Sequence, residues 1–176
     1  MTVTVDELVV ADPADAWTAA GFSVDSDAVC RVGGVRIRLV GRDAQTGVAG
    51  WSLRGLPSGG AFDDLDGIPT TRSSAVGVEP RREREGELGG RPIRQIFFRF
   101  GDVIIEAVGS PGAASEGPST LWGITYVVAD IDTTASFFAE NTTPVKDAVQ
   151  PGRRITTLRH HELGMSVRSA MISARR

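Results

Sequence analysis

The chain has 176 residues, of which 41% are hydrophobic and 23% are charged, so its composition is that of a globular protein with one core or two small ones. Its formal net charge is −3, and it contains neither a dominant basic block nor an apolar run of the roughly 20 residues that a membrane span needs. These features argue against nucleic acid and membranes as partners. The single cysteine, Cys30, excludes an internal disulfide, and the lack of a signal-like N-terminus predicts a cytoplasmic location.

Residues 1–55 are expected to form a first module, which consists of a strand, a helix and three further strands. Alternating apolar residues indicate the first strand at 3–10. Asp12 and Pro13 are typical of a helix start, with Asp12 as the capping side chain, and Gly21 predicts a left-handed helix end. The later strands are expected at 28–32, 35–40 and 48–53. The predicted order is βαβββ.

The middle of the chain is expected to contribute strands only. Residues 56–78 are rich in Gly, Pro, Ser and Asp and contain no apolar run long enough for a strand, which predicts a linker. In the segment 79–109, a charged arm leads through a turn at 86–90 into a hairpin. A second linker is expected at 110–120, where the composition is again rich in Gly, Pro and Ser.

The hairpin within 79–109 is the clearest single signal, because Gly101 and Asp102 join two strand-like runs. A two-residue loop predicts that Phe97 faces Glu106 across the strands, and this register gives the hairpin two unlike faces. The first face is wholly apolar and carries Ile96, Phe98, Phe100, Val103, Ile105 and Ala107. The second face adds polar groups to apolar ones and carries Gln95, Phe97, Ile104, Glu106 and Val108.

Residues 121–176 are expected to repeat the βαβββ order as a last module. A strand at 124–128 is followed by a capping region, Asp130 to Asp132, and by a helix at 133–140. The remaining strands are expected at 146–149, 154–159 and 165–172. The tetrapeptide VVAD occurs at 9–12 and again at 127–130, each time between a predicted strand and a predicted helix, which supports a repeat.

Three stretches resemble proteins of the vicinal oxygen chelate superfamily, which includes glyoxalase I and bleomycin-resistance proteins. They are FFRFGDVIIEAVG at 97–109, LWGITYVVADIDTTASFF at 121–138 and VKDAVQPGRRITTLR at 145–159, and they cover less than half of the chain. The resemblance implies an α+β fold in which repeated βαβββ modules form a half-open barrel, with a ligand or metal on its concave side. The middle module, 79–109, is truncated in comparison, because a first strand and helix are missing before it.

The resemblance also implies where a metal would be held. Metal sites of this superfamily typically combine a His from the first strand of a module with a Glu from its last strand, and Glu106 matches the last-strand Glu. The corresponding positions of the last module hold Gly123 and Ser169, which cannot ligate strongly, and Glu7 lies near the first-strand position of the first module. One matched ligand is a poor set, so the cofactor stays unknown, with a divalent metal as one option.

Glu106 itself has two interpretations. It is a metal ligand or a general base, with a pKa raised by the apolar Phe97 and Ile104 around it, or it is a carboxylate at the mouth of a barrel that bonds to Gln95 or to an arginine. The pair His160-His161 has a similar choice between metal binding and a surface turn. Adjacent strand residues point to opposite faces and cannot readily serve one ion, which favours the turn.

Two further groups of side chains are candidates for ligand contact. Lys146, Arg153 and Arg154 flank the turn at Gln150-Pro151-Gly152, where they either hold a carboxylate or phosphate or simply form the charged rim of a hairpin. The three tryptophans, Trp17, Trp51 and Trp122, either line a pocket for an aromatic ligand or pack in a core; core packing is the favoured interpretation.

Three functions are therefore weighed. The first is binding of a small, largely apolar or aromatic molecule without a complete metal site, with ligand contacts from Gln95, Phe97, Ile104, Thr125 and Arg154. The second is a divalent-metal-dependent lyase, isomerase or dioxygenase that uses Glu106 as catalytic residue and metal ligand. The third is a purely structural interaction module. We also expect the chain to pair with itself as a homodimer, which would complete a barrel or cover exposed strand edges.

Overall fold

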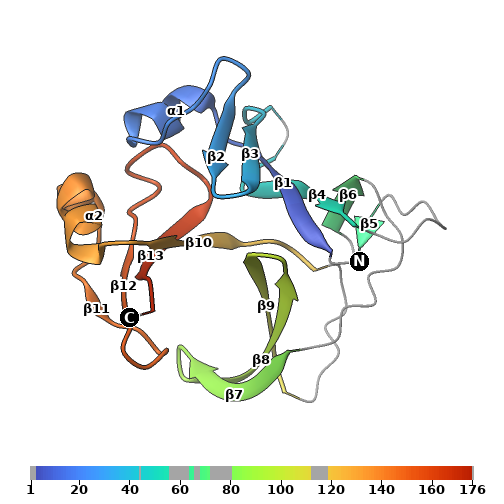
Figure 1. The fold of residues 1–176 in the computed structure, drawn as a ribbon, viewed down its shortest axis with the longest axis vertical. Coiled ribbons are helices and arrows are strands. Elements are labelled where there is room, and N and C mark those ends of the chain that lie inside the picture. The colour runs from blue at the N-terminus through green and yellow to red at the C-terminus, as the bar shows by residue number, and fades with distance from the viewer. Residues whose placement is uncertain are drawn as a thin grey trace. The chain divides into compact units, whose positions relative to one another are not determined.

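The structure is a computed structural model that describes residues 3–43, 45–55, 64–65, 68–71, 81–111 and 119–175. Within these residues the fold is α+β and mostly β, with three sheets and two short α-helices (Figure 1). The chain divides into two compact units. The first unit consists of Met1–Leu8, Gly33–Val35 and Gly50–Thr120; the second consists of Val9–Val32, Arg36–Ala49 and Leu121–Arg176. Each unit therefore combines residues from more than one of the predicted modules.

The N-terminal elements follow the predicted βαβββ order along the chain. They are β1 (Thr4–Val10), α1 (Ala14–Ala19), β2 (Val29–Val32), β3 (Val35–Leu39) and β4 (Val48–Arg54). Gly21 adopts the predicted left-handed conformation, with φ of 96°, and the helix end closes where the Phe22 N–H donates to the Trp17 carbonyl oxygen. The predicted cap of this helix was wrong, because Pro13 is the N-cap residue and no side chain caps the helix.

The linker expected at 56–78 was also wrong in part. Two short strands lie within it, β5 (Asp64–Leu65) and β6 (Ile68–Thr71), and the six-stranded sheet has the order β2-β3-β1-β4-β6-β5. Strands of two and four residues are too short to show an alternating pattern, which explains why composition alone indicated a linker here. The rest of 56–78 lies outside the described residues, as does most of the linker expected at 110–120.

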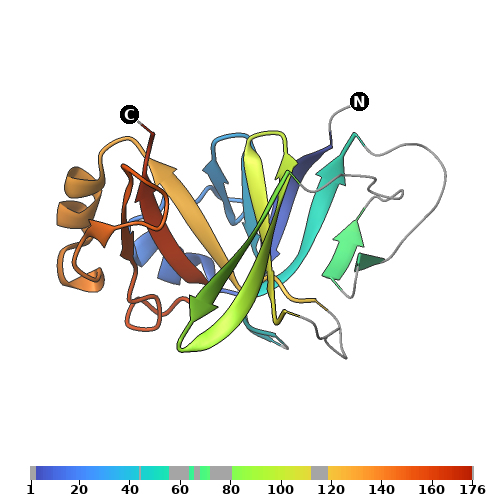
Figure 2. The ribbon, with the colours of Figure 1, turned by 90° about the horizontal axis from the view of Figure 1, so that it is seen from below.

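The predicted hairpin is confirmed in residue detail. Strands β7 (Arg82–Leu88), β8 (Arg91–Phe100) and β9 (Val103–Gly109) form an antiparallel three-stranded sheet, which Figure 2 shows as a bent ribbon of neighbouring strands. Phe97 pairs with Glu106 and Phe100 with Val103, as the loop length predicts. The turn expected at 86–90 is shorter than predicted, because β7 continues through Gly86 and the chain turns at Gly89 and Gly90.

The C-terminal elements repeat the βαβββ order. They are β10 (Gly123–Val128), α2 (Ile131–Phe138), β11 (Lys146–Asp147), β12 (Arg154–Thr157) and β13 (Arg168–Ser173), with a short 3-10 helix at Ala139–Asn141. Asp130 is the N-cap of α2, as predicted, and its side chain accepts hydrogen bonds from the backbone N–H groups of Asp132 and Thr133. The sheet order is β10-β13-β12-β11, and β10 and β13 run parallel.

The two βαβββ segments match in chain order but differ in sheet order. In the C-terminal sheet the fourth strand of the segment, β13, lies between the first and the third. In the N-terminal sheet the first strand, β1, lies between the third and the fourth. Apolar alternation predicts that a stretch is a strand, but it does not say which edge of an earlier strand receives it. The repeat expected from the sequence therefore holds for the order of elements and not for the pairing of strands.

The second unit has a core that joins the two ends of the chain. The Phe22 ring lies 4.9 Å from the Trp17 ring and 5.6 Å from the Tyr126 ring, measured between centroids, so residues near α1 pack against β10. The buried members of this core are Val10, Trp17, Ala20, Cys30, Ile37, Leu39, Tyr126, Ile131, Phe138, Leu158, Met165, Val167 and Met171. Neither helix in the described part of the chain has the length and apolar character to cross a membrane.

Candidate functional site

Three of the five predicted ligand contacts, Gln95, Phe97 and Ile104, lie on one face of the β7-β8-β9 sheet together with Glu106, the predicted catalytic residue. Gln95 is buried and stands opposite Arg84, whose Nε atom donates to the Gln95 side-chain oxygen over 2.6 Å. The Gln95 amide nitrogen in turn donates to the Glu106 carboxylate. Arg84 also lies over the Phe97 ring, with 5.5 Å between its guanidinium carbon and the ring centre. We call Arg84, Gln95, Phe97 and Glu106 the β7–β9 network.

In this network Glu106 is an exposed carboxylate that accepts a hydrogen bond from Gln95. The sequence allowed this bond as the alternative to a metal ligand or general base. The cationic charge of Arg84 is already directed at the Gln95 oxygen, and the amide passes this polarity on to Glu106. Ile104 lies on the same face and is 59% exposed. The network thus links its cation to its carboxylate through one amide, and Ile104 adds an exposed apolar edge beside it.

A metal site built on Glu106 receives no support from its surroundings. In the part of the chain that the structure describes, no three His, Cys, Asp or Glu side chains are grouped as metal ligands. Gly123 and Ser169 lie next to each other on paired strands, in the register Ile124 to Ser169, but neither supplies a strong ligand. The resemblance-derived metal ligands thus stay limited to Glu106.

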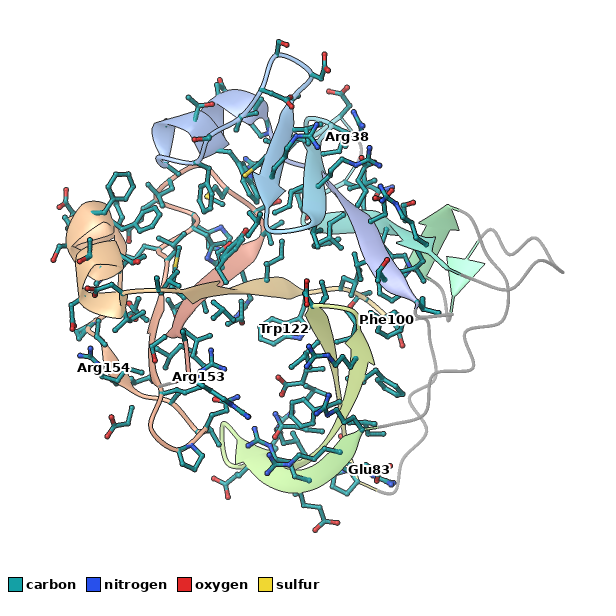
Figure 3. All side chains as sticks on the ribbon, in the orientation of Figure 1. Arg38, Glu83, Phe100, Trp122, Arg153 and Arg154 are labelled. Carbon is teal, nitrogen blue, oxygen red and sulfur yellow. The ribbon has the colours of Figure 1, made fainter. Side chains whose placement is uncertain are left out.

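The other two predicted contacts, Thr125 and Arg154, belong to the β10–β13 sheet and lie on opposite faces of it. Thr125 pairs with Ala170, which pairs with Thr157, so these three residues share a face. Arg154 lies three residues before Thr157 on the same strand and therefore points to the other face. Arg154 forms a two-pronged ion pair with Asp132 of α2, with N–O distances of 2.9 and 2.6 Å. Figure 3 shows Arg153 and Arg154 pointing to opposite sides of the chain at β12. Arg154 therefore acts on the helix side of the sheet.

The face of this sheet that is turned away from α2 is called the distal face here. Strand register assigns its members, because residues two apart along a strand share a face. They are Gly123, Thr125 and Val127 of β10, Arg168, Ala170 and Ile172 of β13, Ile155 and Thr157 of β12, and Lys146 of β11. The helix side of the same sheet contributes Tyr126, Met171 and Leu158 to the core, whereas Val127 on the distal face is 66% exposed.

One end of the distal face carries an exposed tryptophan beneath an arginine. Trp122 is 61% exposed, and the guanidinium carbon of Arg168 lies 5.7 Å from the centre of its ring. Gly123 permits the close approach of the two strands at this point, because a Cβ atom there would sit 2.9 Å from the Arg168 carbonyl oxygen. Trp17 and Trp51 are buried, so the favoured core interpretation holds for them and was wrong for Trp122.

Arg153 stands at the other end of the distal face. Its Nε atom donates to the Ser173 carbonyl oxygen over 2.6 Å, which fixes the guanidinium beside the last residue of β13. Burial, and then the positive charge of Arg175, hold the pKa of Arg153 below its usual range. Figure 3 places Trp122 on the Arg153 side of the sheet. The sequence singled out Arg153 beside the turn, but it gave no signal for Arg168.

A buried carboxylate that the sequence took for a helix cap supports this region. Asp12 has no exposed surface, and it accepts hydrogen bonds from the Trp17 indole over 3.1 Å, from Arg42 over 3.0 and 3.2 Å, and from the Ser166 backbone N–H over 2.8 and 2.9 Å. Burial raises the pKa of Asp12, but the bonds from Ser166, Trp17 and Arg42 outweigh it and lower the pKa below its usual value. We call this arrangement the Asp12 clamp; it anchors the chain two residues before Arg168.

The histidine pair lies in the turn that precedes the Asp12 clamp. His160 and His161 are turn residues, as the favoured interpretation expected, but their rings lie side by side with 4.0 Å between centroids instead of pointing apart. Burial, then the neighbouring His161, lowers the pKa of His160 below its usual value, so the neutral form is favoured. Cys30 is buried, and burial, then the charge of Asp25, raises its pKa, which makes it a poor nucleophile.

The structure thus brings together Gln95, Phe97, Ile104 and Glu106 on one sheet of the first unit, whereas Thr125 and Arg154 belong to the second unit. No family model matches the chain, and no curated protein matches it. One solved structure that it is similar to is a crystal structure described as SMU.1112c, with 13% sequence identity over 55% of this chain and 80% of the other, at a TM-score of 0.26. A similarity of that size carries no argument about function.

Proposed function

We propose that the protein binds a small molecule with a large apolar or aromatic part, and that the ligand occupies the distal face of the β10–β13 sheet. The observation that carries this proposal is the exposure of two large apolar side chains on the β10 side of the distal face, Trp122 at 61% and Val127 at 66%, with the exposed Thr125 between them. Apolar side chains gathered beside a few polar groups are the usual lining of a ligand site. Thr125 keeps its predicted role as a polar contact in this proposal.

The proposal agrees with the resemblance to the vicinal oxygen chelate superfamily, in which we infer that this chain is a member without a complete metal site. The repeated βαβββ order supports membership, and the different strand order of the N-terminal sheet does not. The half-open barrel and the homodimer that the sequence predicts stay proposals. The metal-dependent alternative rests on Glu106, whose only described side-chain donor is the Gln95 amide.

The test compares two exposed aromatic side chains on opposite sides of the same sheet. We use the fluorescent probe 8-anilino-1-naphthalenesulfonate and titrate it into wild-type protein, Trp122→Ala and the matched control Phe137→Ala. Phe137 lies on α2 and is 66% exposed, so it loses a similar amount of exposed ring. We expect Trp122→Ala to weaken probe binding roughly 10-fold and Phe137→Ala to leave it unchanged. Equal effects of the two substitutions, or no effect of Trp122→Ala, would contradict the proposal.

A further inference from the structure

The distal face carries positive charge without any negative charge. Of its nine strand residues, Arg168 and Lys146 are cationic, and none is an aspartate or glutamate. Arg153, directly before β12, adds a third cation on the same side. The acidic side chains of this region, Asp132 and Asp147, lie on the helix side, where Asp132 pairs with Arg154. The charge of the sheet is therefore divided between its faces, with the distal face positive.

Arg168 is held in place by contacts that leave its charge uncompensated. In the described part of the chain it has no acidic partner, and its contact is with the Trp122 ring. A ring contact of this kind orients a guanidinium but removes little of its charge. The planar donor face of an arginine matches the geometry of carboxylates, sulfonates and phosphates. Arg168 over Trp122 thus presents an oxyanion donor directly beside an aromatic platform.

The remaining distal-face residues change from polar to apolar along the strands. The row that follows Gly123 and Arg168 contains Thr125 and Ala170, and the next row contains the apolar Val127, which is exposed, and Ile172, which is buried. Neighbouring rows on one face lie about 7 Å apart along the strands. An apolar body that extends from Trp122 across the small Ala170 would reach the apolar row while its acidic group stays at Arg168. Arg153 marks the far end of the same face.

We infer that the ligand of the distal face is an apolar or aromatic anion, whose carboxylate, sulfonate or phosphate group is bound by Arg168 while its ring stacks on Trp122. This inference rests on the proposed function and adds the charge of the ligand to it. The arginine of the β7–β9 network is less available to an anion, because Arg84 is already engaged by Gln95 and Phe97.

The experiment separates charge from apolar contact by using two probes with the same ring system. The anionic 8-anilino-1-naphthalenesulfonate and the neutral N-phenyl-1-naphthylamine are titrated into wild-type protein, Arg168→Gln and Arg168→Lys. Arg31→Gln is the matched control, since Arg31 is an exposed arginine of the same unit, on β2. We expect wild-type protein to prefer the anionic probe by roughly 10-fold or more. Arg168→Gln should remove that preference, and Arg168→Lys should keep most of it.

The outcomes separate this inference from the proposed function. Equal affinity of wild-type protein for the two probes, or a loss in Arg168→Gln that Arg31→Gln reproduces, would overturn the inference and leave the proposed function intact. Binding of both probes that does not depend on Trp122 would overturn the proposed function itself. Circular dichroism shows whether each variant is folded. If Arg168→Gln is not folded, the preference of the charge-conserving Arg168→Lys for the anionic probe still tests whether the charge at this position binds the anion.

Discussion

The β7-β8-β9 sheet and the β10–β13 sheet both place an arginine over an aromatic ring, yet only one of them leaves the arginine unbalanced. Arg84 over Phe97 donates to Gln95, which donates to the Glu106 carboxylate, so the cation and the carboxylate of the β7–β9 network are joined through one amide. Arg168 over Trp122 lies on the distal face, whose described strand residues include no aspartate or glutamate. An arginine next to a ring is therefore not in itself a sign of a ligand site, and the balance of charge around it decides its role.

The largest effect is expected where the distal face is anchored to the core. Asp12→Ala removes a buried carboxylate, leaves the Trp17 indole and the Ser166 N–H without their acceptor, and leaves Arg42 with the Gly164 carbonyl oxygen alone among its described acceptors. We expect a loss of about 3–5 kcal/mol in the free energy of unfolding, because breaking a buried charged group's partnerships leaves uncompensated polar atoms. Denaturant titration followed by tryptophan fluorescence and circular dichroism measures it.

The control for Asp12→Ala is Asp130→Ala, which removes the aspartate of the second VVAD segment. Asp130 is exposed and caps α2 through two backbone N–H groups, so its removal should cost about 1 kcal/mol. If Asp130→Ala proved as costly as Asp12→Ala, the Asp12 clamp would have no special weight, and the support of the distal face would have to lie elsewhere.

A smaller effect on the free energy of unfolding is expected from Gln95, and it should separate polar side chains that stabilise the fold from those that bind the ligand. Gln95→Leu removes the amide that joins Arg84 to Glu106 and should lower the free energy of unfolding by about 1–2 kcal/mol without changing the affinity for the anionic probe. Arg168→Gln should instead weaken binding of the anionic probe and change the free energy of unfolding by no more than about 0.5 kcal/mol. Thermal melting and probe titration on both variants measure the two properties. A loss of probe binding in Gln95→Leu would break the distinction drawn between the sheets.

Glu106→Gln should have a smaller effect still. Its side chain is exposed, and a glutamine oxygen can accept the same bond from Gln95, so we expect the free energy of unfolding to change by less than about 0.5 kcal/mol. Metal content, measured on protein purified without an affinity tag, and melting temperature test this expectation. A variant that loses stoichiometric metal while keeping its melting temperature would favour the metal-dependent alternative over the binding protein.

The smallest effect on the free energy of unfolding is expected from protonation of His160, whose pKa the charge of Arg168 helps to lower. Burial, His161 and Arg168 lower the pKa of His160, and the hydrogen bond with the Leu158 backbone and the charge of Asp12 oppose them in part. The unfolded chain therefore takes up a proton on His160 more readily than the folded one. The free energy of unfolding should therefore fall as the pH drops below about 6.5, the ordinary histidine value. Denaturant titrations at several pH values should show a weaker decline in His160→Gln. An unchanged decline would assign it to other groups.

The hairpin at β8 and β9 could be predicted in full from the sequence, because a two-residue loop determines the register and alternation determines the faces. Both signals are local. The two VVAD segments show the limit of local signals. Asp130 is the predicted helix cap, whereas Asp12 is buried and accepts hydrogen bonds from Ser166, which lies 154 residues away in the chain. No pattern near Asp12 reveals that partner, so the sequence assigned both aspartates the same role.

The distal face was only partly predictable for the same reason. Thr125 and Arg154 were both expected to contact ligand, but the register that puts them on opposite faces depends on the parallel pairing of β10 with β13. That pairing also brings Arg168 to Gly123 and Trp122, although more than forty residues separate them in the chain. Exposure of Trp122, like burial of Trp17, is a property of the assembled sheet and cannot be read from residue type.

The most direct test of the central claim is an NMR titration that compares the two sheets in one experiment. Backbone amide resonances of ¹⁵N-labelled protein are followed while 8-anilino-1-naphthalenesulfonate is added. We predict that the shifts concentrate at Trp122–Val127 and at Arg168–Ile172, with smaller shifts near Arg153. Shifts that concentrate instead on β7, β8 and β9, around Gln95 and Glu106, would contradict the account.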